Sequence, residues 1–172
     1  MKMKPDQTDW YDADAIQYYN IETSSFIWSV KMQMMTLLNV LGRDKLIEGK
    51  GEMLIKMFGL IPLVNTKDNF KLNSGALQRY LAEIVWFPSA ALSNNIRWEA
   101  IDDSTASATI NAYGTFADGI FYFNKDGSFK KFSTMRYFGG EEDSELHEWI
   151  ITANEFKSIN GIRIPTKSIA TW

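Results

Sequence analysis

Apolar and polar residues alternate over long stretches of this chain. Between Ser24 and Met35, Ser29, Lys31 and Gln33 lie on one side of the pattern, and the other side is entirely apolar. That apolar side comprises Phe26, Trp28, Val30, Met32 and Met34. A period of two is that of a β-strand with one buried face. The pattern therefore predicts a strand over residues 24–35.

Further strands are expected on both sides of a central helical segment. Before it we predict extended segments over 37–48 and 49–62, the second bending near its end. After it we predict six strands, over 96–101, 106–113, 119–123, 128–138, 147–156 and 162–172. Asp-Gly at 126–127 and Asn-Gly at 160–161 are typical of tight hairpin turns, because these pairs tolerate positive φ. Sequence-adjacent strands should therefore pair antiparallel.

One segment, 76–86, has the period of an α-helix. Its apolar stripe comprises Leu77, Leu81, Ile84 and Val85. Asn73 or Ser74 can cap its N-terminus, and Pro88 should end it, because the residue before a proline avoids the helical region. We predict that this is the longest helix and that it packs against the concave side of the sheet.

The order of elements predicts a fold class. A second, short helix is expected over 9–20, with Asp9 or Asp12 as its N-cap and Asn20 as its end. The 172 residues contain no repeat or linker, so we assign 1–172 to a single domain. An antiparallel sheet needs cover on its apolar face. We therefore predict a β-rich α+β fold, in which a strongly curved antiparallel half-barrel of about eight strands wraps around one main helix.

Composition argues against several functions. The chain has no cysteine and one histidine, His147, which we interpret as an ordinary surface residue. It contains no nucleophile elbow, phosphate-binding loop or zinc-protease motif. The net charge of −3 lacks the basic excess of nucleic-acid binders, and no apolar run is long enough to span a membrane. We expect no cofactor, no metal, no nucleic acid and no enzymatic activity, although carboxylate-only catalysis leaves no sequence signature.

The aromatic and methionine residues allow two interpretations. They form either a closed core or the lining of a cavity for apolar ligands. Arg79 and Glu83, four residues apart, are either a solvent-facing pair or a polar group held against the concave sheet. In the second case Arg136 is the expected third member, because arginine binds carboxylates bidentately. The residues that we expect to line such a cavity are Trp28, Met32, Arg79, Tyr80, Glu83, Trp86, Phe87, Trp98, Arg136 and Tyr137.

Several segments together resemble a bacterial family of unknown function. The most specific is RYLAEIVWFP at 79–88, and the others lie at 17–20, 42–44, 49–52, 135–137 and 160–166. That family is in turn similar to half-barrels of the LolA/LppX type, which carry lipoproteins and lipids in the bacterial envelope. The resemblance implies a curved antiparallel sheet around an apolar cavity. It also implies a domain excised from a longer, membrane-associated or envelope protein.

Two functions remain open on this basis. The concave face binds a lipid or another apolar molecule, or the chain is a structural or protein-interaction domain of the envelope with a closed core. The volume between sheet and helix separates them, since ligand pockets begin at about 300 Å³ whereas packed cores leave only small voids.

Overall fold

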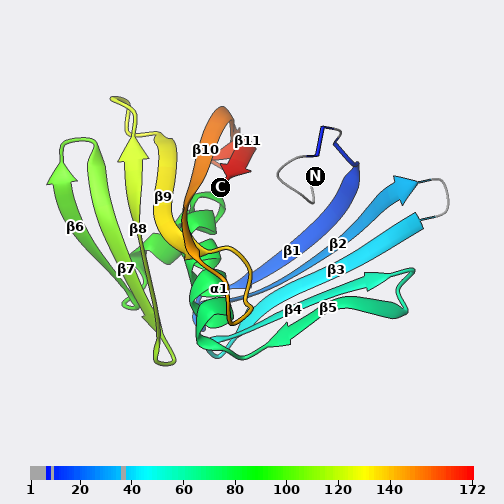
Figure 1. Cartoon of the computed structure of the whole chain (residues 1–172). Helices are drawn as coiled ribbons and strands as arrows, with labels where there is room; N and C mark the ends of the chain where they lie inside the picture. The colour runs from blue at the N-terminus through cyan, green and yellow to red at the C-terminus, as the bar shows by residue number, and fades with distance from the viewer. Residues whose placement is uncertain (1–6, 9, 36–37) are drawn as a thin grey trace.

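The fold consists of two antiparallel sheets joined by one α-helix (Figure 1). The structure, a computed structural model, describes residues 7–8, 10–35 and 38–172. The N-terminal sheet consists, in spatial order, of β1 (Ala13–Asn20), β2 (Ser25–Met35), β3 (Leu38–Ile47), β4 (Lys50–Met57) and β5 (Ile61–Lys67). The C-terminal sheet consists of β6 (Ile96–Asp102), β7 (Thr105–Ala112), β8 (Thr115–Phe123), β9 (Phe129–Tyr137), β10 (Leu146–Ile159) and β11 (Ile162–Thr171). The predicted β-rich α+β class and the antiparallel pairing are confirmed.

The predicted single sheet of about eight strands is wrong. The described residues form eleven strands in two sheets, and these do not close into a barrel. Part of the difference arises at 49–62, where a single bent strand was expected. Phe58 and Gly59 both have positive φ, and Leu60 N donates to Met57 O at 3.1 Å. This turn separates β4 from β5 and makes a hairpin at the edge of the sheet.

The predicted N-terminal helix over 9–20 is also wrong, although Asp9 lies outside the described residues. Ala13–Asn20 is the edge strand β1, paired with β2 so that Tyr18 faces Ile27. Gln17 and Tyr19 turn inward while Tyr18 is exposed. Backbone pairing with β2 outweighs the weak local capping signals, as tertiary context commonly does for short segments.

The main helix is α1 (Phe70–Glu83), the longest helix in the described part of the chain, as predicted. It starts earlier than expected, because Asn69 is the N-cap and accepts a hydrogen bond from Leu72 N at 2.9 Å. Asn73 instead accepts from Gly51 N at 2.7 Å and so ties the helix to β4. The chain continues into two 3₁₀ segments, η1 (Ile84–Trp86) and η2 (Pro88–Leu92).

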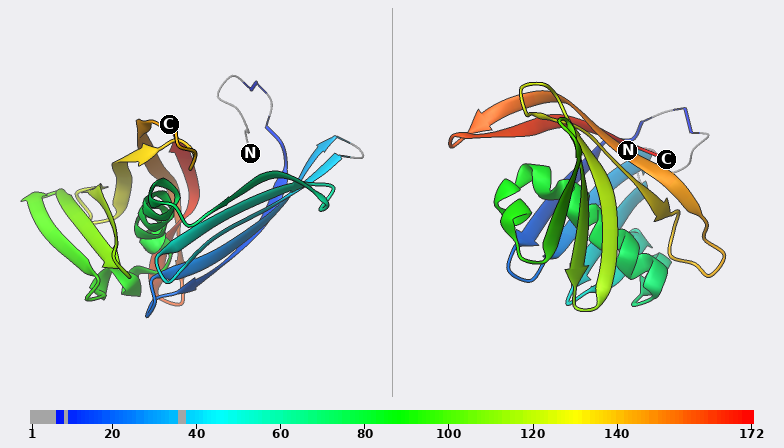
Figure 2. Two further views of the ribbon diagram at one scale, coloured as in Figure 1. Left: turned by 60° about the horizontal axis from the view of Figure 1, so that its bottom comes forward. Right: turned by 90° about the vertical axis from the view of Figure 1, so that its left-hand side faces the viewer.

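Helix α1 lies between the two sheets and packs on both (Figures 1 and 2). Of the predicted stripe, Leu77, Leu81 and Ile84 are buried and Val85 is half-buried. The buried face meets the inner side of the C-terminal sheet, where Phe121 and Phe132 are also buried. The predicted burial of the stripe is therefore confirmed, and the main core lies between α1 and this sheet.

Two predicted turns are confirmed. The two-residue turn between β10 and β11 consists of Asn160 and Gly161, with φ of 51° and 81°. Gly127, in the turn between β8 and β9, has φ of 79° and donates its N–H to Asn124 O at 2.8 Å. Both positions lie in the left-handed region that favours Asn and Gly.

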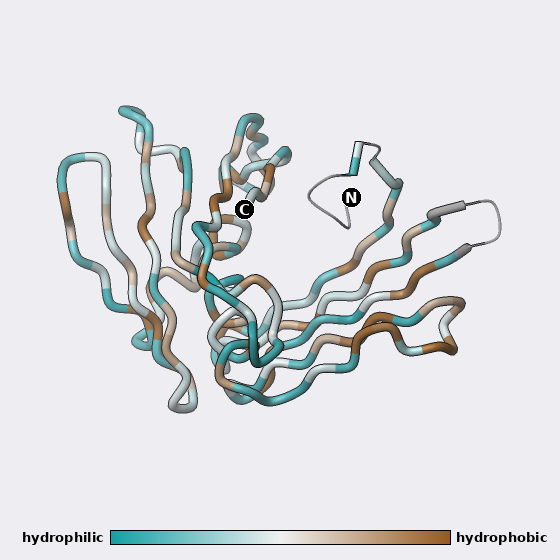
Figure 3. Tube along the Cα trace, viewed as in Figure 1, coloured by the Kyte–Doolittle hydropathy of each residue, from teal (hydrophilic) through white to brown (hydrophobic). Residues whose placement is uncertain are grey.

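The β4–β5 hairpin carries exposed apolar side chains at the far end of the N-terminal sheet (Figure 3). We call this surface the apolar tip; it comprises Phe58, Leu60, Ile61 and Leu63. Clusters of this kind are uncommon on monomeric proteins and often mark interaction surfaces. None of the helices in the described residues is long and apolar enough to cross a membrane.

Candidate functional site

A cavity of about 400 Å³ lies between the two sheets, beside α1. We call it the inter-sheet cavity. Its apolar lining comprises Trp28, Val30, Met32, Val40, Gly42, Met53, Ile55, Trp86, Trp149, Ile151 and Ala170. Its polar lining comprises Arg43, Asp44, Arg79, Glu83, Arg136 and Ser168. Most of the wall is therefore apolar, and a small number of charged groups come together where α1 meets the sheets.

The alternation of β2 and β3 places the wall residues of the N-terminal sheet. Trp28, Val30 and Met32 share the inward face of β2, opposite Asp44, Gly42 and Val40 of β3. Gly42 leaves room for the Val30 side chain on the neighbouring strand, because a Cβ at position 42 would lie 2.7 Å from it. Asp44 is thus the one charged group on this inward run of β3, level with Trp28.

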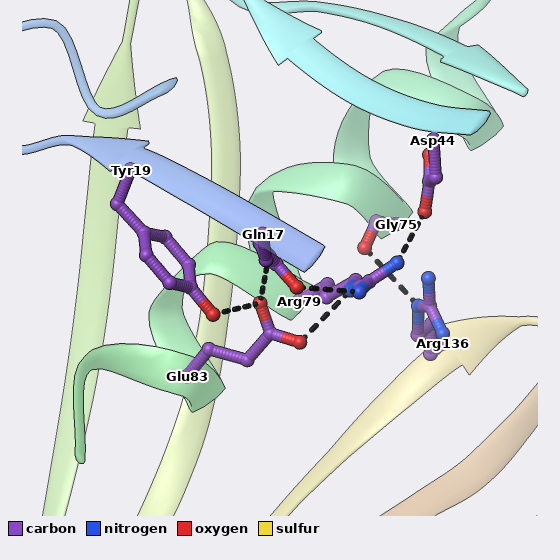
Figure 4. Close-up of polar contacts among 7 residues, drawn as sticks. All are labelled: Gln17, Tyr19, Asp44, Gly75, Arg79, Glu83 and Arg136. Carbon is purple, nitrogen blue, oxygen red and sulfur yellow. Dashed lines mark hydrogen bonds and ion pairs between the residues drawn. The ribbon is translucent and has the colours of Figure 1, made fainter. Parts of the chain in front are cut away.

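We call the part of the cavity lined by Asp44, Arg79, Glu83 and Arg136 its charged floor. The polar contacts of the floor centre on Arg79 (Figure 4). Arg79 Nε donates to Glu83 Oε1 at 2.9 Å, Nη1 to Asp44 Oδ2 at 2.6 Å, and Nη2 to Gln17 Oε1 at 2.9 Å. Glu83 Oε2 in turn accepts from Gln17 Nε2 at 2.7 Å and from Tyr19 Oη at 3.1 Å. We call these five residues the Arg79 cluster. They join α1, β1 and β3 into one hydrogen-bonded group.

The Arg79 cluster is largely removed from water. Glu83 and Asp44 are only 7% and 6% exposed. The Arg79 guanidinium also lies over the rings of Phe26 and Trp28, 5.1 and 4.8 Å from their centroids. Burial by itself would lower the pKa of Arg79, but the neighbouring carboxylates outweigh it and raise that pKa. The Arg79–Glu83 pair is therefore held inside the fold, and the solvent-facing interpretation is wrong.

The hydroxyl of Tyr19 is affected by the same neighbours. Burial raises the pKa of Tyr19, and the Glu83 carboxylate raises it further. The phenol therefore stays protonated and acts as a hydrogen-bond donor to Glu83.

Arg136, on β9, has a different environment from the one we predicted. Its Nε donates to Gly75 O at 3.1 Å, not to Glu83 (Figure 4). Its guanidinium lies over Trp149 and Trp172, at 4.5 and 5.2 Å from the ring centroids. In the part of the chain that the structure describes, no carboxylate forms an ion pair with Arg136. Burial, together with the charge of Arg79, lowers the pKa of Arg136 to about 10, although the charges of Asp44 and Glu83 oppose this shift.

The structure brings together six of the predicted site residues. Trp28, Met32, Arg79, Glu83, Trp86 and Arg136 line the inter-sheet cavity. Four others lie elsewhere. Tyr80 is 1% exposed in the core, Phe87 lies tilted against the Tyr19 ring with 4.0 Å between centroids, and Tyr137 lies beside Lys71. Trp98 lines a second hollow of about 540 Å³ on the other side of η1, with Phe121, Phe123 and Phe156.

Several cavity residues were not among those predicted. Asp44 could have been found, because a lone carboxylate on the inward face of an alternating strand is costly unless it has a partner. Trp149 and Ile151 follow the inward alternation of β10, but the sequence does not show which sheet faces which. Gln17 and Tyr19, which bind Glu83 in the Arg79 cluster, were not predicted because residues 9–20 were expected to form a helix.

Fold and site together define a class: a β-rich α+β protein whose two antiparallel sheets and single described helix border an apolar cavity with a charged floor. The chain belongs to a family of unknown function, DUF6920, whose family model matches residues 1–172. The predicted membership in a family of unknown function is therefore confirmed. Neither curated proteins nor solved structures gave a match.

Proposed function

We propose that the inter-sheet cavity binds a lipid, an acyl chain or another apolar small molecule without converting it. The observation that carries this proposal is the cavity itself, about 400 Å³ with a mostly apolar wall. Volumes of this size lie within the range of ligand pockets, whereas a packed core leaves only small voids.

The chemistry of the wall supports a ligand that is apolar over most of its length. Met32 and Met53 line it from neighbouring parts of the N-terminal sheet. Methionine side chains are flexible and polarisable, so they adapt to chains of different shape. Tryptophan rings from both sheets supply large apolar surfaces, and the charged floor gives an amphipathic molecule one preferred direction.

Binding is favoured over catalysis by the state of the floor. Both oxygens of Glu83 accept hydrogen bonds from side chains of the Arg79 cluster. Asp44 Oδ2 accepts from Arg79, and Asp44 Oδ1, which has no partner among the described residues, is buried. A general base must instead reach the proton of a substrate. The expected similarity to LolA/LppX-type carriers agrees with a binding role, and we extend the proposal to carriage of a lipid or lipoprotein acyl chain in the bacterial envelope.

Native mass spectrometry of the protein purified from cells tests this function. We expect an adduct of lipid-like mass on the wild-type chain. Val40→Phe should reduce that adduct, because Val40 lines the cavity and is 4% exposed. Ile101→Phe, at a side chain that is 56% exposed and lies outside both the cavity and the apolar tip, is the matched control and should retain the adduct. A bare wild-type mass, together with no quenching of tryptophan fluorescence by a brominated acyl methyl ester, would refute the proposal.

The apolar tip supports a second candidate function, a protein-interaction domain. The tip borders β5, an edge strand whose outer backbone groups have no neighbouring strand in the N-terminal sheet. Exposed edges of this kind pair readily with another chain. The simplest partner is a second copy, so analytical ultracentrifugation should show a dimer that Leu60→Ser and Leu63→Ser weaken. A monomer at all concentrations would contradict this pairing.

A further inference from the structure

We infer that Arg136 binds an oxyanion head group, a carboxylate or a phosphate monoester, at the end of the ligand that the inter-sheet cavity holds. The ligand is accordingly an acidic amphiphile. This inference rests on the proposed function and specifies which apolar molecules the cavity selects. It comes from three features of Arg136: its donors without an acceptor among the described residues, its fixed orientation and its lack of a direct ion-pair partner there.

The first feature is the set of unused donors. A guanidinium carries five N–H donors in a planar fork. In Arg136 only Nε has a protein acceptor, Gly75 O at 3.1 Å. Among the described residues no acceptor forms a hydrogen bond with Nη1 or Nη2 of Arg136. By contrast, each of the three nitrogens of Arg79 donates to a side chain of its own cluster. Arg136 therefore presents the outer edge of its fork without a partner.

The second feature is the orientation of that edge. Arg136 lies over two indole rings, those of Trp149 and Trp172. Contact with ring faces restrains the guanidinium plane while leaving its N–H edge available. The hydrogen bond to Gly75 O restrains the remaining rotation. Such a fork is arranged for two parallel bonds to a carboxylate or phosphate.

The third feature is the absence of a direct ion-pair partner. Removing a guanidinium from water is costly unless an anion compensates it. The two carboxylates of the floor, Asp44 and Glu83, both form ion pairs with Arg79, and neither forms one with Arg136. Their charges raise the pKa of Arg136 without contact, but burial and the charge of Arg79 outweigh them and lower that pKa to about 10, which still leaves the side chain protonated at neutral pH. A ligand anion would supply a contact partner for the fork.

The position of Arg136 also sets the direction of the bound molecule. Arg136, Arg79 and Glu83 lie at the floor, level with Trp28 and Asp44. From Trp28 the inward face of β2 continues to Met32, opposite Val40, over about 13 Å of strand. The head group therefore sits at the floor and the apolar chain extends along β2 and β3.

Tryptophan quenching with three ligands of the same brominated chain tests the inference: the carboxylic acid, its methyl ester and the alkyl phosphate. The wild-type protein should bind the acid, the phosphate or both at least about tenfold more tightly than the neutral ester, since hydrogen bonds to charged groups are worth about 1.5–3 kcal/mol. The acid and phosphate arms show which oxyanion is preferred. Arg136→Gln should reduce anion binding to the level of the ester and leave the ester unchanged.

Controls separate this inference from the proposed function. Arg97→Gln removes an arginine whose side chain is 80% exposed, and it should keep the anion preference. Arg136→Lys keeps the charge but not the fork, and it should give an intermediate preference. Equal binding of acid, phosphate and ester by the wild type, or a preference that survives in Arg136→Gln, would overturn the head-group assignment while cavity binding stands. Failure of all three ligands to bind would overturn both.

Discussion

Two arginines at the floor of the same cavity have opposite surroundings. Arg79 and Arg136 both lie against tryptophan rings, and both line the inter-sheet cavity. Arg79 has two carboxylate partners and one amide partner within the fold. Among the described residues, Arg136 donates to one backbone carbonyl and forms no ion pair. A buried charge that is paired with side chains of several elements holds those elements together, whereas a buried guanidinium without an ion pair still has donors available for an external anion. We therefore assign stability to the first region and recognition to the second.

Replacing Arg79 should have the largest effect on stability. Arg79→Met removes the cation that Asp44 and Glu83 share and leaves two largely buried carboxylates without it. We expect a loss of about 4 kcal/mol in the free energy of unfolding, within the range for breaking a buried pair. Urea denaturation measures it, with Arg97→Met as a control that should change stability by no more than about 0.5 kcal/mol. A loss below about 1 kcal/mol would mean that the cluster is effectively solvated.

Replacing Glu83 should cost somewhat less. Glu83→Ala leaves Arg79 with Asp44, so we expect a loss of about 3 kcal/mol. Because the two residues share one network, the double variant with Arg79→Met should lose less than the sum of the single losses, by at least about 1 kcal/mol. Denaturant melts of the two single variants and the double variant measure this coupling. Additive small effects would remove the basis for treating the cluster as one unit.

Replacing Arg136 should lower the free energy of unfolding far less than replacing Arg79, so it tests whether the two arginines differ in role. Arg136→Gln removes a charge that forms no ion pair among the described residues, along with one bond to Gly75 O. We expect the free energy of unfolding of the ligand-free protein to change by about 1 kcal/mol or less. The same urea melts apply. A loss as large as that of Arg79→Met would show that Arg136 is a structural residue and that the two regions do not differ.

Glu52 is as buried as Glu83, but its basic partners, unlike Arg79, are partly exposed. Burial would raise the pKa of Glu52, but hydrogen bonds from Lys45 and Arg43 and the charges of Lys45 and Lys67 lower it to about 2. A lowered folded-state pKa stabilises the protein above the unfolded value of about 4.5, and this contribution is lost as pH falls towards 2. The partners are partly exposed, so we expect Glu52→Gln to cost at most about 1 kcal/mol at pH 7. The difference from wild type should vanish near pH 2 in pH-dependent melts.

His147 should have the smallest effect. It is exposed on β10, and its ring lies edge-on to that of Phe138, at 6.1 Å between centroids. We expect His147→Ala to change the free energy of unfolding by no more than about 0.5 kcal/mol and to leave ligand binding unchanged. A loss above about 2 kcal/mol, measured in the same melts, would contradict its interpretation as an ordinary surface residue.

The parts of the fold that could be predicted are those whose periodicity is strong and unbroken. The alternation from Phe26 to Met32 and the stripe through Leu77 and Leu81 each point to one element type. The β4–β5 hairpin was missed because Phe58 occupies its first turn position. That residue has positive φ, and Asn or Gly is the usual residue at such a position. β1 was missed because its inward side chains, Gln17 and Tyr19, are polar, so no apolar alternation marks the strand.

The candidate site was only partly predictable for a related reason. A strand pattern shows which side chains share a face, but it does not show which sheet that face meets. Trp28 and Trp98 look equivalent in the sequence, yet the break between β5 and β6 places them in different hollows. Arg79 and Glu83 followed from helix spacing alone. Asp44, their third partner, depends on how β3 lies across α1, which no local pattern contains.

The most direct test of the account is a crystal structure of the protein with the brominated acyl chain, because bromine can be located by its anomalous signal. We predict a bromine peak inside the inter-sheet cavity, beside Met32 and Val40, with the carboxylate or phosphate of the chain within hydrogen-bond distance of Arg136. Bromine found only on the apolar tip or in the second hollow would contradict the central claim that the inter-sheet cavity is the ligand site.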